Sequence, residues 1–236
     1  MISINNLQKK FGARTVLQDM NLQIPAGQAT GIVGPNGSGK TTTIKSLLGL
    51  VKPTAGEIYI DGKSIEGEWD YRRNIGYMPQ VARYPENMTV GELLSFIKAM
   101  RGSRTERDSE LLSYFNLESE VDKRMRALSG GMRQKVGAIL AMMFDPQILI
   151  FDEPTAGLDP KSSVRFKQLV HEEKEQGKTV LLTSHIMSEI EELTDYLIFM
   201  VEGRIRYHGP MHELMKRQQE QRLESAVAKM MEETAA

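Results

Sequence analysis

The most informative stretch of this chain is ATGIVGPNGSGKTT, residues 29–42. It opens with a short apolar run bounded by glycine, which is typical of a buried strand, and it leads into an amphipathic segment that reaches Leu50. Between the two, residues 34–41 match the pattern G-x-x-x-x-G-K-[ST]. Glycines let backbone N–H groups wrap phosphate oxygens, the helix N-terminus adds partial positive charge, Lys40 can reach the β- and γ-phosphates, and the Thr41 hydroxyl can ligate Mg²⁺. The stretch therefore predicts a strand, a nucleotide phosphate-binding loop and a helix.

The rest of the chain predicts an α/β fold around this unit. Residues 2–4 and 22–24 alternate apolar and polar side chains, the pattern of an antiparallel sheet with one wet face. Helical spacing takes over from residue 89 to 144, which predicts a helical subdomain inserted at about 82–145. Strands and helices then alternate, which indicates βαβ units. The expected strands are 29–33, 57–60, 74–78, 148–151, 179–183 and 196–200, and the expected later helices are about 161–176 and 186–193. The predicted fold is a P-loop NTPase core with a mostly parallel sheet, an N-terminal antiparallel β subdomain and an inserted helical subdomain.

The chain is expected to form one domain over residues 1–210, followed by a C-terminal amphipathic helix over 211–236. No long Pro/Gly linker or internal repeat separates independent domains. Apolar residues near the C-terminus, Leu223, Ala226, Val227, Met230 and Met231, follow one face of a helix. This helix could pack on its own domain, self-associate or meet a partner, and the sequence leaves the three possibilities open.

An acidic pair follows the apolar segment ILIF at residues 148–151. Asp152 and Glu153 should emerge at the carboxyl edge of a parallel sheet, where ligands of such sheets bind. Asp152 would hold Mg²⁺ through water, and Glu153 would polarise the water that attacks the γ-phosphate. Taken alone, an Asp-Glu pair before Pro154 could equally be a turn with a helix-capping acid, but the phosphate-binding loop favours the catalytic interpretation.

Two further motifs point to a family. The segment LSGGMRQ, residues 128–134, stands at the start of a predicted helix just ahead of the acidic strand, and TSH, residues 183–185, follows the next strand. Together with the phosphate-binding loop and the acidic pair, they resemble the ATP-binding cassette of ABC transporters. The resemblance extends from about Ile2 to Pro210, with the motifs in the order the family has them.

The resemblance implies roles for individual residues. Phe11 would stack on adenine, Gln80 would sense Mg²⁺ and water, His185 would contact the γ-phosphate, and Asp159 lies in the D-loop. Thr41, Gln80 and Asp152 would serve the Mg²⁺ ion, and Lys40, Gln80, Glu153 and His185 would serve catalysis. The ATP-binding loop would comprise Gly34, Pro35, Asn36, Gly37, Ser38, Gly39, Lys40, Thr41 and Thr42. The signature motif would comprise Leu128, Ser129, Gly130, Gly131, Met132, Arg133 and Gln134.

The signature motif implies that two chains share each ATP. Ser129, Gly130 and Gly131 at a helix N-terminus form a second anion-binding end, although the chain already has its own phosphate loop. The expected assembly is a head-to-tail dimer around two ATP molecules, formed by two copies of the chain or with a paired ABC subunit. It closes on the γ-phosphate and relaxes after hydrolysis. Two residues depart from the family's commoner choices: Met132 stands where Gln is usual, and Phe11 replaces Tyr. Neither change removes a catalytic group, and Phe keeps a ring face for stacking.

The composition of the chain indicates where in the cell such an ATPase would work. The chain has 236 residues, 40% of them hydrophobic, no cysteine and a formal net charge of −1. No apolar run approaches the roughly 20 residues of a spanning helix, and the N-terminus lacks the charged and apolar regions of a signal peptide. The expectation is therefore a cytoplasmic protein, held at the inner face of the cell membrane by its partner, that uses ATP and Mg²⁺ to power a separate integral membrane permease.

The type of transporter and the alternatives follow from what the sequence lacks. The cassette has no long C-terminal regulatory domain of the kind found on sugar-importer ATPases, so it looks closer to exporter-type or accessory systems. Within these, a similarity to the ATPase that accompanies copper-site assembly of nitrous oxide reductase rests on no diagnostic residue. The alternative function is a soluble ABC ATPase that acts on nucleic acid or ribosomes. Such proteins usually carry two cassettes or a long coiled-coil insertion, so no nucleic-acid partner is expected. A purely regulatory nucleotide-binding module is disfavoured because Gln80, Glu153 and His185 are all present.

Overall fold

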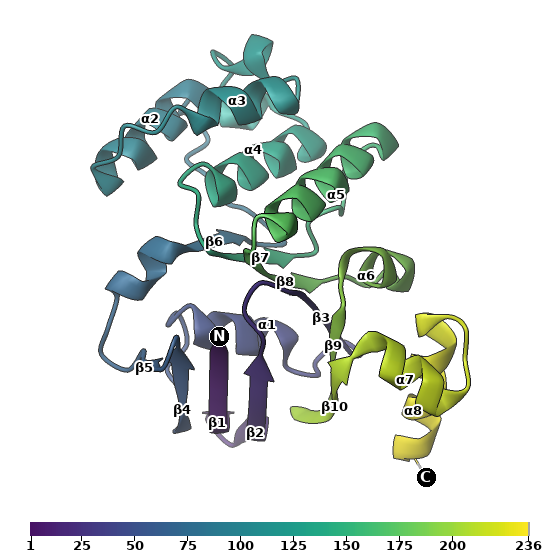
Figure 1. Cartoon of the computed structure of the whole chain (residues 1–236). Helices are drawn as coiled ribbons and strands as arrows, with labels where there is room; N and C mark the ends of the chain where they lie inside the picture. Colours follow the sequence, from purple (N-terminus) through teal and green to yellow (C-terminus); the bar gives the residue numbers. More distant parts are fainter. Residues whose placement is uncertain (236) are drawn as a thin grey trace.

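Two β-sheets organise the molecule, a computed structural model that describes residues 1–235 (Figure 1). The smaller sheet is antiparallel and has the strand order β2-β1-β4-β5. Its strands are β1 (Ile2–Phe11), β2 (Arg14–Ile24), β4 (Ala55–Ile60) and β5 (Lys63–Ser64). The larger sheet has the order β10-β9-β3-β8-β7-β6. Its strands are β3 (Ala29–Val33), β6 (Ile75–Met78), β7 (Ile148–Asp152), β8 (Thr179–Thr183), β9 (Tyr196–Val201) and β10 (Arg204–Pro210).

The larger sheet is parallel except at one edge. β3 pairs in parallel with β8 and β9, and β7 pairs in parallel with β6 and β8. Every residue of β3, β7 and β8 is buried because helices or the second sheet cover both faces, which explains their continuous apolar character. β10 was not anticipated from the sequence; it pairs antiparallel with β9 through a tight turn in which Glu202 and Gly203 both have positive φ.

The helices form two layers around this sheet. Helix α1 (Lys40–Leu47) lies between the two sheets, and its Ile44 and Leu47 share a core with both (Figure 1). Helices α2 (Val90–Arg101), α3 (Arg107–Tyr114), α4 (Gly130–Met142) and α5 (Pro160–Glu175) lie beyond the opposite face. Within residues 1–235, short 3₁₀ turns also form at η1 (Asp70–Asn74), before β6, and at η2 (Glu118–Glu120) and η3 (Met125–Ala127), between α3 and α4. The predicted fold class is confirmed, with its antiparallel β subdomain, mostly parallel core and inserted helices.

Helices α2, α3 and α4 fall within the expected insertion at about 82–145. A capping box starts α2, in which Thr89 and Glu92 satisfy each other's backbone N–H groups. Helix α4 packs directly on β6, since a Cβ built on Gly76 would collide with the carbonyl oxygen of Ala141. The inserted helices therefore share one continuous core with the face of the sheet below them.

The C-terminal segment corrects the expectation of a single helix over residues 211–236. Residues 211–235 form two helices, α7 (Met211–Gln218) and α8 (Leu223–Ala235), and Ala236 lies outside the described residues. Gln219 adopts a left-handed conformation that ends α7, and its N–H bonds to the carbonyl oxygen of Lys216. The chain then turns back, so that Leu223, Ala226, Val227 and Met230 are buried in the main core. Helix α8 packs against α7 and against α6 (Met187–Leu193), so the segment covers its own domain.

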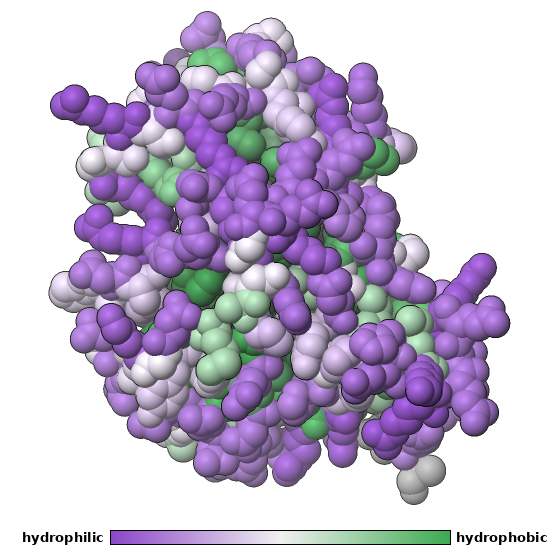
Figure 2. All heavy atoms as spheres, viewed as in Figure 1, coloured by the Kyte–Doolittle hydropathy of each residue, from purple (hydrophilic) through white to green (hydrophobic). Residues whose placement is uncertain are grey.

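The outer surface in the same view is mostly hydrophilic, with small apolar areas among the charged side chains (Figure 2). Within residues 1–235, no helix combines the length and the apolar character needed to cross a bilayer.

Candidate active site

A cavity of about 400 Å³ opens at the carboxyl edge of the parallel strands. It collects residues from the phosphate loop and from the ends of β6, β7 and β8, segments that are far apart in sequence. The residues that line it are Arg14, Val16, Asn36, Gly37, Gly39, Lys40, Thr41, Thr42, Gln80, Asp152, Glu153 and His185. The cavity thus brings together Lys40, Gln80, Asp152, Glu153 and His185, the residues to which the family resemblance assigns catalytic or Mg²⁺-binding roles.

Two features set the conformation of the phosphate loop: a glycine with positive φ and hydrogen bonds from the loop's own lysine. Gly34 has a φ of 149°, and a Cβ there would collide with the carbonyl oxygen of Met200. The Lys40 ammonium donates to the carbonyl oxygens of Gly34 at 2.7 Å and Pro35 at 3.2 Å, which closes the loop. Burial lowers the pKa of Lys40, and the nearby charges of Glu153 and Asp152 partly offset this effect. The loop therefore presents a cation and the start of α1 to the cavity.

Thr183 fixes the acidic pair. Its hydroxyl donates to Asp152 Oδ1 at 2.6 Å and accepts from the Glu153 N–H at 3.1 Å, and its carbonyl oxygen accepts from the same N–H at 3.1 Å. Glu153 has a φ of 55°, a left-handed conformation uncommon for a residue with a side chain. This turn directs Glu153 into the cavity while Asp152 stays 5% exposed at the strand end.

Glu153 faces His185 across the cavity, with His185 Nε2 2.9 Å from Glu153 Oε1. Burial raises the pKa of Glu153, with a smaller upward contribution from Asp152, while His185 and Lys40 act in the opposite direction. A carboxyl group with a raised pKa is a stronger base than an ordinary carboxylate, so it is better suited to accept a proton from water.

The signature segment has a different position. Ser129 caps α4 by accepting the Met132 N–H at 3.2 Å, and Leu128 is buried, whereas Ser129 and Gly130 are exposed. Among the described residues, none of Leu128 to Gln134 lines the cavity that contains Lys40. The buried Gln134 donates to the carbonyl oxygens of Glu153 at 3.3 Å and Pro154 at 3.2 Å, so α4 supports the acidic loop from behind.

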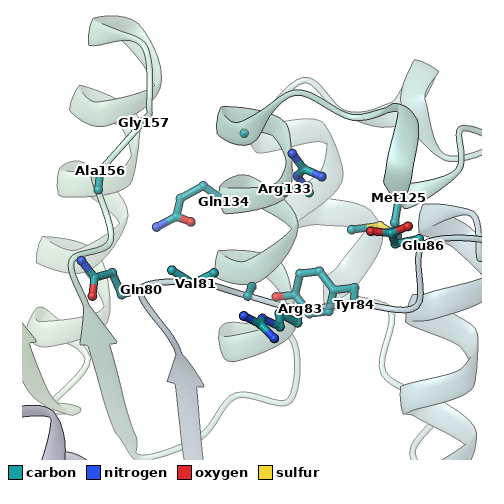
Figure 3. A pocket seen from close by; sticks show the side chains of 12 residues that line it. Gln80, Val81, Arg83, Tyr84, Glu86, Met125, Arg133, Gln134, Ala156 and Gly157 are labelled. Carbon is teal, nitrogen blue, oxygen red and sulfur yellow. The ribbon is translucent and has the colours of Figure 1, made fainter.

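A second cavity has a volume of about 700 Å³ (Figure 3). Gln80 lines both cavities. The start of α4 and the loop after β7 form its other walls, through Gly130, Arg133, Gln134, Ala156 and Gly157. The remaining lining residues are Val81, Ala82, Arg83, Tyr84, Glu86 and Met125.

Phe11 and Asp159 lie outside the lining of the first cavity. Phe11 ends β1, is 51% exposed and carries the Lys9 ammonium 4.6 Å from its ring centroid. Asp159 caps α5 by accepting the Ser162 N–H at 2.9 Å. Each of these side chains is accessible, Phe11 at the end of the hairpin opposite Arg14 and Asp159 in the loop that borders the second cavity.

The sequence motifs did not indicate Arg14 or Val16, and they assigned no role to Thr183, although this residue opens the TSH motif. Arg14 and Val16 reach the cavity because β2 lies against the phosphate loop, and a Cβ on Gly37 would be 3.9 Å from the Arg14 guanidinium. No sequence signal near Arg14 indicates this. Thr183 could have been found, because it ends a buried strand beside the predicted acidic pair, where a side-chain hydroxyl needs a polar partner.

Comparisons with known proteins agree with the site. The sequence model of the family described as ABC transporter matches residues 17–156. A Nod factor export ATP-binding protein from Ralstonia nicotianae is 36% identical over 220 residues, which cover 91% of this chain and 68% of that protein.

Two solved structures share the fold. The structure of an ATP-binding subunit of an ABC transporter superimposes with a TM-score of 0.89 at 29% identity, over 98% of this chain and 99% of the other. A dimeric ATP-binding cassette in a post-hydrolysis state, bound to ADP and phosphate, gives a TM-score of 0.79 at 30% identity, over 89% and 98% of the two chains. The chain therefore belongs to the ABC transporter family, as an ATP-binding subunit with ATPase activity.

Proposed function

We propose that two copies of this chain pair head to tail, hydrolyse ATP at sites that they share, and thereby power an export-type permease supplied by another chain. One observation carries the proposal. A single cavity contains Lys40, Gln80, Asp152, Glu153 and His185, while the exposed signature end of α4 lies outside it. Each copy thus has a complete phosphate loop and a separate anion-binding helix end, which suits the γ-phosphate of an ATP held by a second copy.

The residues support an in-line displacement at the γ-phosphorus. On ATP binding, Lys40 would exchange the carbonyl oxygens of Gly34 and Pro35 for β- and γ-phosphate oxygens, a charge-assisted interaction. Glu153 accepts a proton from water as the water oxygen bonds to the γ-phosphorus and the bond to the β–γ bridging oxygen breaks. ADP and phosphate leave. His185, held at the Glu153 carboxylate, supplies a donor for the γ-phosphate oxygens.

The oxygen donors around the cavity fit Mg²⁺. Thr41, Gln80 and Asp152, whose side chains carry a hydroxyl, an amide and a carboxylate group, line it together. Among residues 1–235, no group of three or more His, Cys, Asp or Glu side chains could hold a metal alone. This combination suits Mg²⁺, which is usually bound through one or two carboxylates plus substrate phosphates. When bound, Mg²⁺ would neutralise charge on the phosphate oxygens.

The permease partner is proposed from the family and from the second cavity. Because Gln80 lines both cavities, an element of another protein seated in the second one would touch a residue that also faces the nucleotide. Val81, next in sequence, is 71% exposed on that side and offers an apolar contact. The export direction follows from the similarity to a Nod factor export protein, and the place of work would be the cytoplasmic face of the membrane.

The substitution Glu153→Gln tests the hydrolysis. Turnover should fall about 10²- to 10⁴-fold because a general base is lost, while ATP binding persists and an ATP-bound dimer accumulates on size-exclusion chromatography with light scattering. Glu175→Gln, an exposed change at the end of α5, is the matched control. Hydrolysis by Glu153→Gln at the parental rate would remove Glu153 from its proposed role.

Recovery from membranes tests the partner. The tagged full-length chain should co-purify from solubilised membranes with an integral membrane protein, and Val81→Glu should weaken that recovery without changing ATP binding. Reproducible recovery with ribosomes or nucleic acid instead would favour a soluble ABC ATPase.

A further inference from the structure

A buried carboxylate in α6 has no part in the chemistry described so far. Glu189 is 8% exposed, and its Oε2 accepts hydrogen bonds from the hydroxyls of Thr155 at 2.7 Å and Ser184 at 3.0 Å. Among residues 1–235, no Lys, Arg or His side chain lies within ion-pair distance of it. Burying a carboxylate costs free energy unless hydrogen bonds replace water, so these two donors set where the side chain lies.

The two donors belong to the two loops that carry the facing groups of the active site. Thr155 stands two residues after Glu153, and Ser184 directly precedes His185. Both donors are themselves buried, at 8% and 3% exposure. One carboxylate oxygen therefore connects the loop after β7 to the loop after β8.

Further hydrogen bonds join this side-chain contact to the backbone of both loops. The Ser184 hydroxyl, which donates to Glu189, also accepts the N–H of Ile186 at 3.0 Å. His185 thus lies between two residues whose positions are fixed by the same hydroxyl. On the other loop, the Ala156 N–H bonds to the Glu153 carbonyl oxygen at 3.2 Å, so Thr155 is part of the tight turn that begins at Glu153.

Neither Glu153 nor His185 is fixed from its own loop alone. Glu153 holds an uncommon backbone conformation, and the His185 side chain is 52% exposed, yet their side chains meet at 2.9 Å. Catalytic geometry of this kind needs support from neighbouring residues, because small displacements of reacting groups lower rates strongly.

We propose that Glu189 is a positioning residue that holds the Glu153 and His185 loops in register for hydrolysis. The inference rests on the proposed roles of Glu153 and His185. Glu189 does not touch the nucleotide cavity, so its removal should change the rate of hydrolysis and leave the affinity for ATP unchanged.

The main test compares Glu189→Ala with Glu189→Gln in the full chain. The alanine variant should lower kcat about tenfold to a hundredfold, because the two loops lose their shared acceptor. The glutamine variant should stay within about threefold of the parent, because its amide oxygen can still accept both hydroxyls. The Kd for ATP, measured by isothermal titration with Mg²⁺ absent, should not change in either variant.

The matched control is Glu192→Ala. Glu192 lies on the same helix but is half-exposed, and its carboxylate bonds to Lys167 at 2.6 Å at the surface. This variant should hydrolyse ATP at the parental rate.

A second pair of variants covers the case in which Glu189→Ala fails to fold. Thr155→Val and Ser184→Ala each remove one donor and keep the carboxylate, and each should lower kcat with ATP affinity retained. A purely structural role would lower the thermal midpoint of these variants and leave kcat unchanged, and that result would overturn the proposal.

The Glu153→Gln variant distinguishes a failure of the positioning role of Glu189 from a failure of the catalytic role of Glu153. If it abolishes turnover while Thr155→Val, Ser184→Ala and any folded Glu189→Ala protein keep the parental kcat, the positioning role is wrong and the proposed function stands. If Glu153→Gln itself hydrolyses normally, the proposed role of Glu153 as general base fails and the positioning role of Glu189 fails with it.

Discussion

The chain contains two glycine-bearing segments that each open a helix, and they differ in completeness. The phosphate loop, residues 34–41, needs its glycines: Gly34 has a φ of 149° and sits against the Met200 carbonyl oxygen. At the signature segment, residues 128–134, a Cβ on Gly130 would have no atom within 4 Å apart from its chain neighbours and the backbone of its own helix. The first segment is packed and closed by Lys40, whereas the second exposes Ser129 and Gly130 to solvent.

The caps of the two helices show the same difference. Gly39 provides no side-chain cap for α1, so its first N–H groups face the cavity, whereas Ser129 caps α4 by accepting the Met132 N–H. The N-termini of α1 and α4 carry the same kind of partial positive charge, but they serve different purposes. One end is a site complete within the chain, and the other is a surface that we expect to become a site only against the nucleotide of a second copy.

The largest expected difference between the two segments is in how a glycine substitution changes the free energy of unfolding. Gly34→Ala should lower the free energy of unfolding by about 3 kcal/mol or more, because a left-handed backbone and a main-chain collision act together. Gly130→Ala should change it by less than about 0.5 kcal/mol. Urea unfolding followed by circular dichroism measures both. Equal losses would show that the signature is as tightly packed as the loop.

Next in size is the effect of the loop's cation. Lys40→Ala should weaken ATP binding about 10- to 100-fold, because hydrogen bonds to charged groups contribute about 1.5–3 kcal/mol. Lys45→Ala, an exposed change on the same helix, is the control and should bind ATP normally. Isothermal titration of the monomer checks this, and an unchanged affinity in Lys40→Ala would contradict the role of the loop.

The open segment should respond in the opposite way. Gly130→Asp should leave the ATP affinity of the monomer within about twofold and lower hydrolysis at least about tenfold, because a carboxylate at an anion-binding helix end repels phosphate. Ala228→Asp on α8 adds the same charge at an exposed position as a control. Weakened binding in the monomer would mean that the signature serves its own chain's site.

The smallest effect concerns pH. The pKa of Glu153 is raised in the folded state above its ordinary value of 4.5, so its ionisation disfavours folding increasingly as pH rises through the raised pKa. Glu153→Gln should therefore raise the thermal midpoint slightly at pH 7. The gain should shrink as pH falls through the raised pKa toward 4.5 and be lost below 4.5, where the carboxyl group is protonated in both states. Calorimetry over this pH range checks the sign. A lower midpoint at pH 7 would mean that the contact with His185 outweighs burial.

Most of the fold could be predicted from the sequence because its signals are local. Buried parallel strands read as apolar runs, and the phosphate loop is a continuous motif. The C-terminal break could not be predicted, since Gln219 is a residue common within helices, and its left-handed conformation follows from packing Leu223 and Met230 back onto the core. β10 was missed because Arg204 to Pro210 alternates polar and weakly apolar residues at an edge of the sheet.

The sequence by itself determined the chemistry: a lysine and glycines after a strand, carboxylates at the end of another, a histidine after a third. These are properties of residue type and spacing, which need no distant contact. Only the tertiary structure decided that Arg14 reaches the phosphate loop, that Gln80 borders two cavities, and that Glu189 connects the loops of Glu153 and His185. The physical reason is that such contacts depend on which strands become neighbours in the sheet, and burial of the whole core decides that order.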